Sequence, residues 1–274
     1  METLGFSLNT MNSGVIIIGW LELLLATLFM VVAGMVSLAL SLGLLRSLAI
    51  ATLRTYLQLI ALGFVLTWIF TTHSAWIVLG IFLFMMLMTA QILLQRIKHK
   101  PPHLYLNTLT AVFLSTVIVT FSVTGLIVHV EPWYDPRYVI TIGGMVLGNS
   151  MNGIALTLER FFDDMNKRVA EVNQALAFGG TPWEVSLPSI RTALAAGLTP
   201  TINSMSAVGL VAIPGMMTGQ LLAGADPVEA SKYQIVVMLM ISAATALGSI
   251  CSIYLVYKQA FDSEWRFILG TWKI

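Results

Sequence analysis

The side chains that could do chemistry in this chain are concentrated in one polar segment, residues 159–191. Of the 14 basic and 13 acidic residues among 274, nine fall in these 33 positions. Charged groups at this density are costly in lipid and are typical of a surface that meets water or another protein. We therefore expect the segment to be offered to a soluble partner. Its charged residues are Glu159, Arg160, Asp163, Asp164, Lys167, Arg168, Glu171, Glu184 and Arg191.

The polar segment also carries clear signals for helix ends. The apolar spacing predicts a short helix from Asp163 to Phe178. Gly179-Gly180 should end it, because glycine adopts the left-handed C-cap conformation without strain. Thr181 should then cap a new helix, with Pro182 in its first position and Glu184 completing a capping box. The same pattern at 226–229 (DPVE) predicts the start of the last long helix.

A second group of polar side chains lies inside apolar segments. Within 143–153, Met145, Asn149 and Asn152 share one helix face with Leu156, and within 190–214 Asn203 and Ser206 share a face with Thr199. Two interpretations stay open: hydrogen bonding between packed helices, or a path for a solute. The candidate pathway residues are Glu22, Met145, Asn149, Asn152, Asn203, Met205, Ser206, Met216, Met217 and Gln220.

The candidate residues suit few other chemistries. Methionine sulfur is a ligand for soft metals such as copper(I), but most of the 15 methionines are expected to fill gaps in packing. The four histidines have no ligand spacing, and the single Cys251 excludes an internal disulfide. We therefore expect no enzymatic activity in this chain, leave metal ligands unassigned, and find no basic patch for nucleic acid.

The elements that position these residues are apolar and long. The chain is 57% hydrophobic and 10% charged, far from the roughly 25% charged residues of soluble domains. This predicts an all-α polytopic membrane protein with a single transmembrane domain over 1–274 and about seven spans. The predicted spans are 15–45, 54–71, 75–95, 104–130, 138–158, 190–214 and 230–257.

The connectors indicate the orientation of the spans. Twelve of the 14 basic residues follow the odd-numbered spans, whereas Arg137 and Lys232 lie on the other side. The positive-inside rule then places the N-terminus outside and the C-terminus in the cytoplasm. The polar segment 159–191 is accordingly predicted to be a cytoplasmic loop of a multi-pass protein in the cell's inner (plasma) membrane.

One uncharged run is too long for a single helix. From Thr192 to Ala225 there are 34 residues without a charge, which would measure roughly 50 Å as a helix, against ~30 Å of hydrocarbon. The sequence predicts a kink at Thr199-Pro200 and an interruption at Pro214-Gly215 and Thr218-Gly219. Residues 214–224 are therefore a candidate re-entrant or pathway-lining element.

The segment QALAFGGTPWEV (174–185) resembles the coupling loop of ABC transporter permeases. One position departs from that pattern: the family usually has an acidic residue six positions before the glycine, where this chain has Asn173, and Glu171 lies two positions earlier. Together with GNSMNG (148–153), RTYLQLIALGFVL (54–66) and the segment 191–237, which contains PGMMTGQ and DPVEASKYQ, it resembles the FetB-like family, associated with iron export and, in plants, with aluminium tolerance. The resemblance covers about residues 46–257. It implies a homodimer bound to two copies of a separate ATPase, which carries the ATP and Mg, with no cofactor on this chain. The coupling residues it implies are Glu171, Gln174, Ala177, Phe178, Gly179, Gly180 and Thr181.

Three functions are compatible with these features. The first is the membrane subunit of an ATP-driven exporter of iron or another metal, which short outer loops favour. The second is an ABC importer permease that works with a binding protein. The third is a secondary transporter without an ATPase, which the coupling-loop pattern disfavours.

Overall fold

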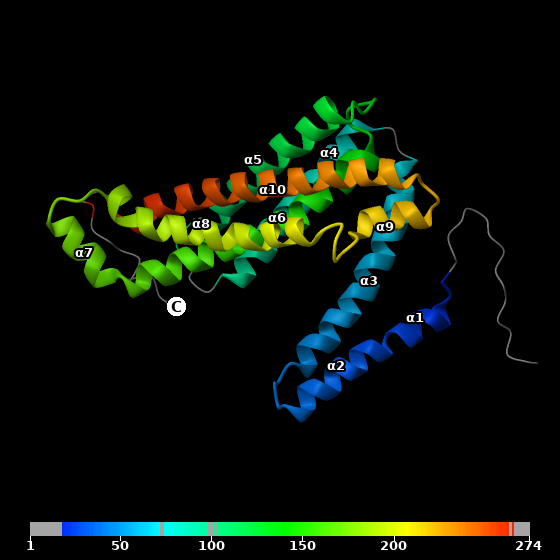
Figure 1. Ribbon diagram of the computed structural model, residues 1–274, viewed down its shortest axis with the longest axis horizontal. Helices are drawn as coiled ribbons and strands as arrows, with labels where there is room; N and C mark the ends of the chain where they lie inside the picture. The colour runs from blue at the N-terminus through cyan, green and yellow to red at the C-terminus, as the bar shows by residue number, and fades with distance from the viewer. Residues whose placement is uncertain (1–17, 72–73, 98–100, 102, 263–264, 266–274) are drawn as a thin grey trace, which may run out of the picture. The chain divides into compact units, whose positions relative to one another are not determined.

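A computed structural model describes residues 18–71, 74–97, 101, 103–262 and 265, and within them the chain is helical (Figure 1). Six helical stretches are long and apolar enough to cross a membrane. This confirms the all-α polytopic class, with close to the seven spans expected. The helices are α1 Trp20–Ala26, α2 Leu28–Ala39, α3 Leu45–Phe70, α4 Ala75–Arg96, α5 Leu104–Ser122, α6 Pro136–Lys167, α7 Val169–Ala177, α8 Pro182–Ala207, α9 Gly215–Leu222 and α10 Pro227–Tyr257, with a π-helical turn at Val123–Ile127 and a 3₁₀ turn at Lys258–Ala260.

The described helices form two compact units, 1–72 with 218–230 and 73–217 with 231–274. In the first unit, α1 and α2 together make the first membrane-length stretch, Trp20–Ala39. The Tyr56 hydroxyl of α3 donates a hydrogen bond to the Leu23 carbonyl of α1 at 2.7 Å. A turn with Gly43 at φ 68° leads into α3.

Helix α3 corrects the predicted second span. It begins at Leu45, not at 54, so Arg46 lies within the helix and not in a connector, and Arg54 lies inside the helix and not at its start. Arginine is compatible with a helix end near a membrane surface, because its long stem lets the guanidinium reach water. The helix therefore extends through residues that the sequence analysis assigned to a loop.

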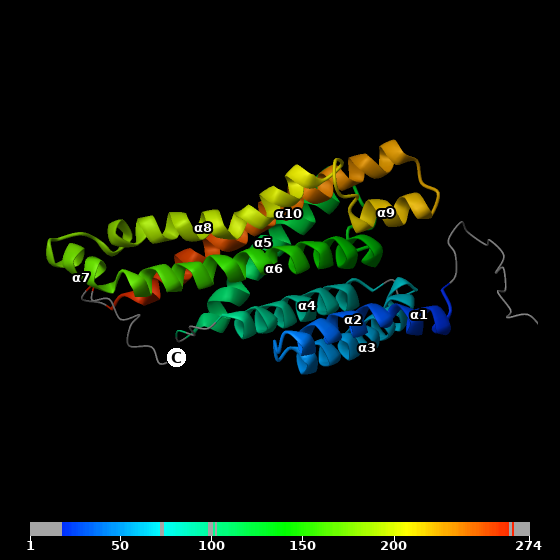
Figure 2. The same ribbon diagram turned by 60° about the horizontal axis from the view of Figure 1, so that its bottom comes forward.

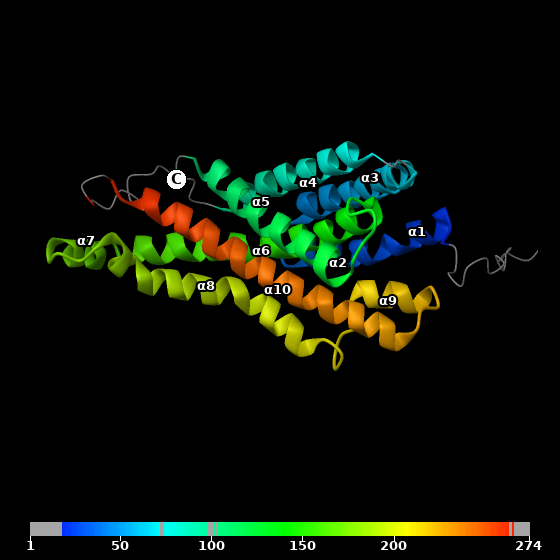
Figure 3. The same ribbon diagram turned by 90° about the horizontal axis from the view of Figure 1, so that it is seen from above.

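Helix α6 is central to the second unit and packs against α4, α5 and α8. Phe82 of α4 and Ile154, Leu158, Phe161 and Phe162 of α6 are almost completely buried. Helix α10 runs beside α6 (Figures 1 and 3), and the Thr157 hydroxyl donates to Ser249 at 3.1 Å. The core of this unit thus combines apolar side chains with buried hydroxyl groups.

Helices α6 and α8 cross at glycines that the sequence analysis did not select. A methyl group at Gly197 would lie 2.7 Å from the Gly153 carbonyl oxygen, and one at Gly153 would lie 2.9 Å from the Gly197 carbonyl oxygen. Two other glycines of α6, Gly144 and Gly148, are spaced for close helix packing but behave differently: Gly144 faces the Met85 side chain, and a methyl group at Gly148 would have no heavy atom of another segment within 4 Å. The close approach within the chain therefore occurs at Gly153 and Gly197.

The long uncharged run is interrupted after α8. This helix continues through Pro188 and Pro200 and ends at Ala207, so Pro200 does not end it. Residues 208–214 are not helical, with Gly209 at φ 80°, and α9 begins at Gly215, as the Pro214-Gly215 signal predicted. Thr218-Gly219 lies inside α9 and makes no second interruption. Helix α8 is not among the six apolar stretches, because its many Pro, Ser and Thr residues, with Asn203, lower its mean hydropathy.

Candidate functional site

The polar segment 159–191 folds as two helix ends joined by α7 (Figure 2). Helix α6 continues to Lys167, so the predicted helix from Asp163 to Phe178 is divided at Arg168, which has φ −104° and ψ 17°. The continuation of α6 follows from packing, since Phe161, Phe162 and Met165 are buried. Only the short α7 therefore forms the tip of the segment.

Arg168 connects the three helices at this end. Its Nε and Nη2 atoms donate to the two carboxylate oxygens of Glu171 at 2.9 and 2.6 Å. Its Nη1 donates to the Ser189 hydroxyl of α8 at 2.9 Å, and that hydroxyl donates to Asp164 of α6 at 2.6 Å. The guanidinium lowers the pKa of Glu171 below its usual value through these hydrogen bonds. A bidentate arginine fixes orientation as well as charge.

The apolar stripe of α7 faces the same helices. Val172 is buried, and Val169, Ala175 and Leu176 are half-buried, as the helical spacing predicted. At the start of α8, the Trp183 ring packs edge-on against Tyr257 of α10 with 5.3 Å between ring centroids. Helix α7 thus packs against α8, and the start of α8 packs against α10 through Trp183.

The turn between α7 and α8 follows the predicted pattern. Gly179 has φ 91°, and the Gly180 amide donates to the Ala175 carbonyl at 3.0 Å. The Thr181 amide donates to the Glu184 carboxylate at 2.9 Å, and the Glu184 amide donates to the Thr181 hydroxyl at 3.3 Å. Both halves of the capping box are present, and the hydrogen bonds from Thr181 lower the pKa of Glu184.

The residues predicted to couple to an ATPase lie together in this region. Glu171, Gln174, Ala177 and Gly179 are exposed, and Gly180 and Thr181 are half-buried. Phe178 has 82% of its surface exposed although it is a large aromatic residue. An aromatic side chain held out by a rigid turn is a typical anchor for a protein partner.

The amides of α6 have separate partners. Met145 is half-buried, whereas Asn149, Asn152 and Leu156 are exposed along one face of the helix. Asn149 donates to the Met145 carbonyl of its own helix at 2.8 Å. Asn152 accepts a hydrogen bond from Arg96 at the end of α4. Asn152 is compatible with the packing interpretation, because it bonds to another helix. Asn149 is compatible with the pathway interpretation, because it is exposed and bonds within its own helix.

The candidates from the other helices lie in different places. Asn203 and Ser206 are exposed on α8, and the Ser206 hydroxyl donates to the Ile202 carbonyl at 3.0 Å. Met205 and Met217 line a cavity beside α10, whereas Met216 packs against an apolar cluster. Gln220 is on α9, and Glu22 is an exposed residue of α1 in the first unit. Among the described residues, no three His, Cys, Asp or Glu side chains are placed to hold a metal.

Sequence reasoning missed four residues of these sites: Arg168, Arg96, and the α10 residues Gln234 and Met238, which line the same cavity as Met205 and Met217. Arg168 had a usable signal, since Asp164 and Glu171 stand four residues before and three after it, at helical ion-pair spacing. Gln234 also had one, as a lone amide in an apolar run. Arg96 and Met238 had none, because their roles depend on contacts across the fold.

Six membrane-length helical stretches and a polar segment with α7 at its tip define a polytopic helical membrane protein. The uncharacterised protein family UPF0014 matches residues 20–261, and the chain belongs to this family. It is 32% identical over 248 residues to "Probable iron export permease protein FetB" of Escherichia coli, covering 90% of this chain and 94% of that protein. It is 34% identical to the membrane protein YjkA of Bacillus subtilis, covering 88% of this chain and 95% of that protein. It is 37% identical to "Protein ALUMINUM SENSITIVE 3" of Arabidopsis thaliana, covering 78% and 77%. No solved structure shows a significant match.

Proposed function

We propose that this protein is the membrane subunit of an ABC transporter that exports iron or another metal across the inner (plasma) membrane. Two copies of the chain would bind two copies of a separate ATPase, which supplies ATP and Mg. The observation that carries the proposal is the exposed Phe178 on a turn with fixed helix ends on both sides. The name of the Escherichia coli relative supports iron export as the direction and cargo.

The attachment of the tip supports a mechanical role. Arg168 connects α6, α7 and α8, and Trp183 contacts α10, so a force applied to α7 would reach these membrane helices without bending a flexible loop. A lever of this kind needs only small motions of an ATPase to change the packing of helices. The exposed amides on α6 and α8 would then face either the solute path or the second copy.

Replacing Phe178 with alanine tests the docking surface. We expect about thirtyfold weaker binding of the cognate ATPase, the size of a hot-spot loss of about 2 kcal/mol, with unchanged membrane insertion. Phe84→Ala is the matched control, since Phe84 is 59% exposed on α4, a membrane-length helix. Affinity measured in nanodiscs checks this. Equal affinity of both variants would remove the ATPase from the proposal.

Transport measurements test the cargo and its path. Proteoliposomes with the permease and its ATPase should move iron or another metal only with ATP. Asn149→Leu combined with Asn152→Leu should abolish this transport and leave the assembled complex intact. Transport driven by an ion gradient without nucleotide would support a secondary transporter, and a requirement for a binding protein would support an importer.

A further inference from the structure

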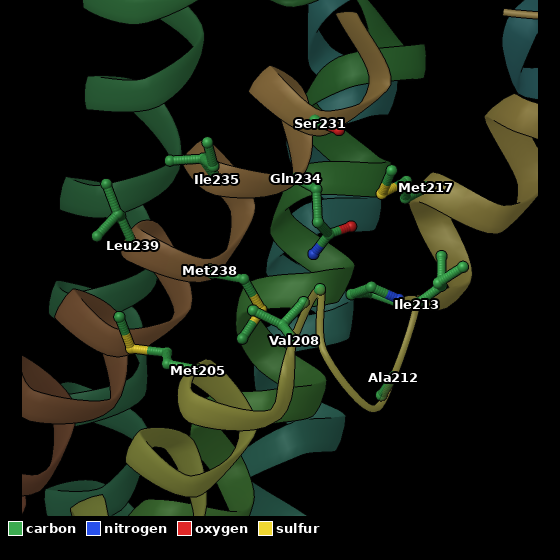
Figure 4. Close-up of a pocket in the computed structure, with 12 residues that line it drawn as sticks. Met205, Val208, Ala212, Ile213, Met217, Ser231, Gln234, Ile235, Met238 and Leu239 are labelled. Carbon is green, nitrogen blue, oxygen red and sulfur yellow. The ribbon is translucent and has the colours of Figure 1, made fainter. Parts of the chain in front are cut away.

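A cavity of about 500 Å³ lies between the end of α8, the segment 208–214, the start of α9 and α10 (Figure 4). All of its lining residues belong to the second unit. Met205 comes from α8, Met217 from α9, and Gln234 and Met238 from α10. The interruption after Ala207 therefore leaves a space where continuous helices would have packed together.

Gln234 places an unsatisfied hydrogen-bond acceptor in this cavity. Its side chain is 6% exposed and points into the space (Figure 4). Its Oε1 atom has no hydrogen-bond partner within the described part of the chain. Buried amide oxygens are nearly always hydrogen-bonded, because leaving one unpaired loses the interaction that water would have made. A bound molecule with an O–H or N–H group would satisfy this acceptor.

The walls determine what kind of molecule fits. Among the described residues that line the cavity, only Gln234 and Ser231 have polar side chains, and none is charged. A divalent or trivalent cation would find no carboxylate, imidazole or thiolate here. The flexible thioethers of Met205, Met217 and Met238 instead suit an apolar surface of variable shape. The cavity therefore does not suit a bare divalent or trivalent metal ion.

The surroundings of the cavity are apolar as well. Leu210 and Val211 of the 208–214 segment are 89% and 87% exposed, and Ile235 and Leu239 of α10 are also exposed. Exposed apolar groups of this size on a membrane-length helix and the adjoining loop are compatible with lipid and not with water. A ligand would therefore reach the cavity from the hydrocarbon phase.

We propose that this cavity binds an uncharged, mostly apolar organic molecule and that Gln234 Oε1 accepts a hydrogen bond from its single hydroxyl or amide donor. The cavity shares Met205 and Met217 with the predicted pathway residues, but it includes neither the amides of α6 nor the ATPase surface at α7. Its existence does not depend on the transport function. Occupancy would fill the gap between α8 and α10 at the interruption of the uncharged run.

Photolabelling of the full-length protein in nanodiscs tests the site. The probe is 3-azioctanol, a photoreactive alcohol with one hydroxyl donor. We expect saturable adducts within 205–217 and 231–239 by mass spectrometry, and protection by 1-octanol. The isomeric ether 1-methoxyheptane has no donor and should protect about tenfold less well after correction for lipid partitioning, as expected for the loss of one buried hydrogen bond.

Gln234→Met isolates the acceptor, since it removes the amide at nearly constant size. We expect 1-octanol to protect this variant about tenfold less well than it protects the original protein. On the variant, 1-octanol and 1-methoxyheptane should then protect equally. Gln91→Met, at an exposed position of α4, is the matched control and should behave as the original protein. The comparison of the two isomers on the unmodified protein remains decisive if Gln234→Met does not fold.

Three results would overturn the proposal. The first is labelling that does not saturate and follows lipid exposure along the chain. The second is equal protection by 1-octanol and 1-methoxyheptane on the unmodified protein. The third is an absence of adducts combined with a disulfide between two copies of Met238→Cys, since a second chain would then occupy the cavity.

Discussion

Gly153 of α6 and Gly197 of α8 determine how closely these two helices approach. Each has the carbonyl oxygen of the other within 3 Å of the position where a methyl group would be. We expect Gly197→Ala to destabilise the protein by about 1–3 kcal/mol, because both neighbours are backbone or buried side chain and cannot move away. Thermal unfolding followed by maleimide labelling of the half-buried Cys251 measures this loss.

Gly148→Ala provides the matched control for that substitution. Gly148 also lies within a helix, but a methyl group there would have no heavy atom of another segment within 4 Å. Both variants gain the same helix propensity from alanine, so their difference isolates the contact between α6 and α8. Equal unfolding temperatures would show that the two helices separate easily.

Gly179 tests a backbone requirement and not a contact. Its φ of 91° is unfavourable for residues other than glycine, although a methyl group there would meet open space. We expect Gly179→Val to displace Phe178 and reduce ATPase co-purification at least tenfold, because a strained turn costs on the order of 1–3 kcal/mol. Gly179→Asn should retain most of the binding, since asparagine tolerates positive φ better. Identical losses in both variants would point to a steric cause.

At the scale of elements, the start of α8 depends on the charge of Glu184. The pKa of this carboxyl is lowered in the folded protein by the amide and hydroxyl of Thr181. A lowered folded-state pKa means that the stabilisation is complete above the unfolded pKa and is lost as pH falls through the folded pKa. The capping box should therefore be intact at neutral pH and open under acidic conditions.

Amide hydrogen exchange of the peptide around residues 178–190 checks this pH dependence. We expect protection relative to neutral pH to fall as pH is lowered through the acidic range, after correction for the intrinsic exchange rate. Glu184→Gln should remove the part of this change that comes from the cap, because glutamine accepts the same hydrogen bonds without titrating. An identical pH profile in both proteins would assign the change to Glu171 or to another carboxyl.

Much of the turn between α7 and α8 could be predicted from the sequence, because the signals that form it are local. Gly179, Thr181 and Glu184 act on backbone atoms within five residues, and their types at those positions leave few conformations open. The interruption at Pro214-Gly215 was predictable for the same reason. By contrast, the division at Arg168, the crossing at Gly153 and Gly197, and the cavity at Gln234 depend on distant segments. Periodicity carries no information about those contacts.

At the scale of the whole molecule, orientation is the property on which the proposed function depends most. The basic residues predict that α7 faces the cytoplasm and that the turn before α10 faces outside. An ATPase has access to α7 only in that orientation. Because the chain contains one cysteine, a Cys251→Ser background permits single reporters on the two predicted sides.

Asn173→Cys on α7 and Ala225→Cys before α10 are suitable reporters, since both residues are exposed. We expect a membrane-impermeant maleimide to label Asn173→Cys only in sealed inside-out vesicles and Ala225→Cys only in right-side-out vesicles. This pattern follows from the 12 basic residues on one side of the predicted spans and two on the other. The reverse pattern would place Phe178 outside, where no ATPase could drive the permease. Labelling of both reporters from one side would mean that an even number of membrane spans separates α7 from the start of α10.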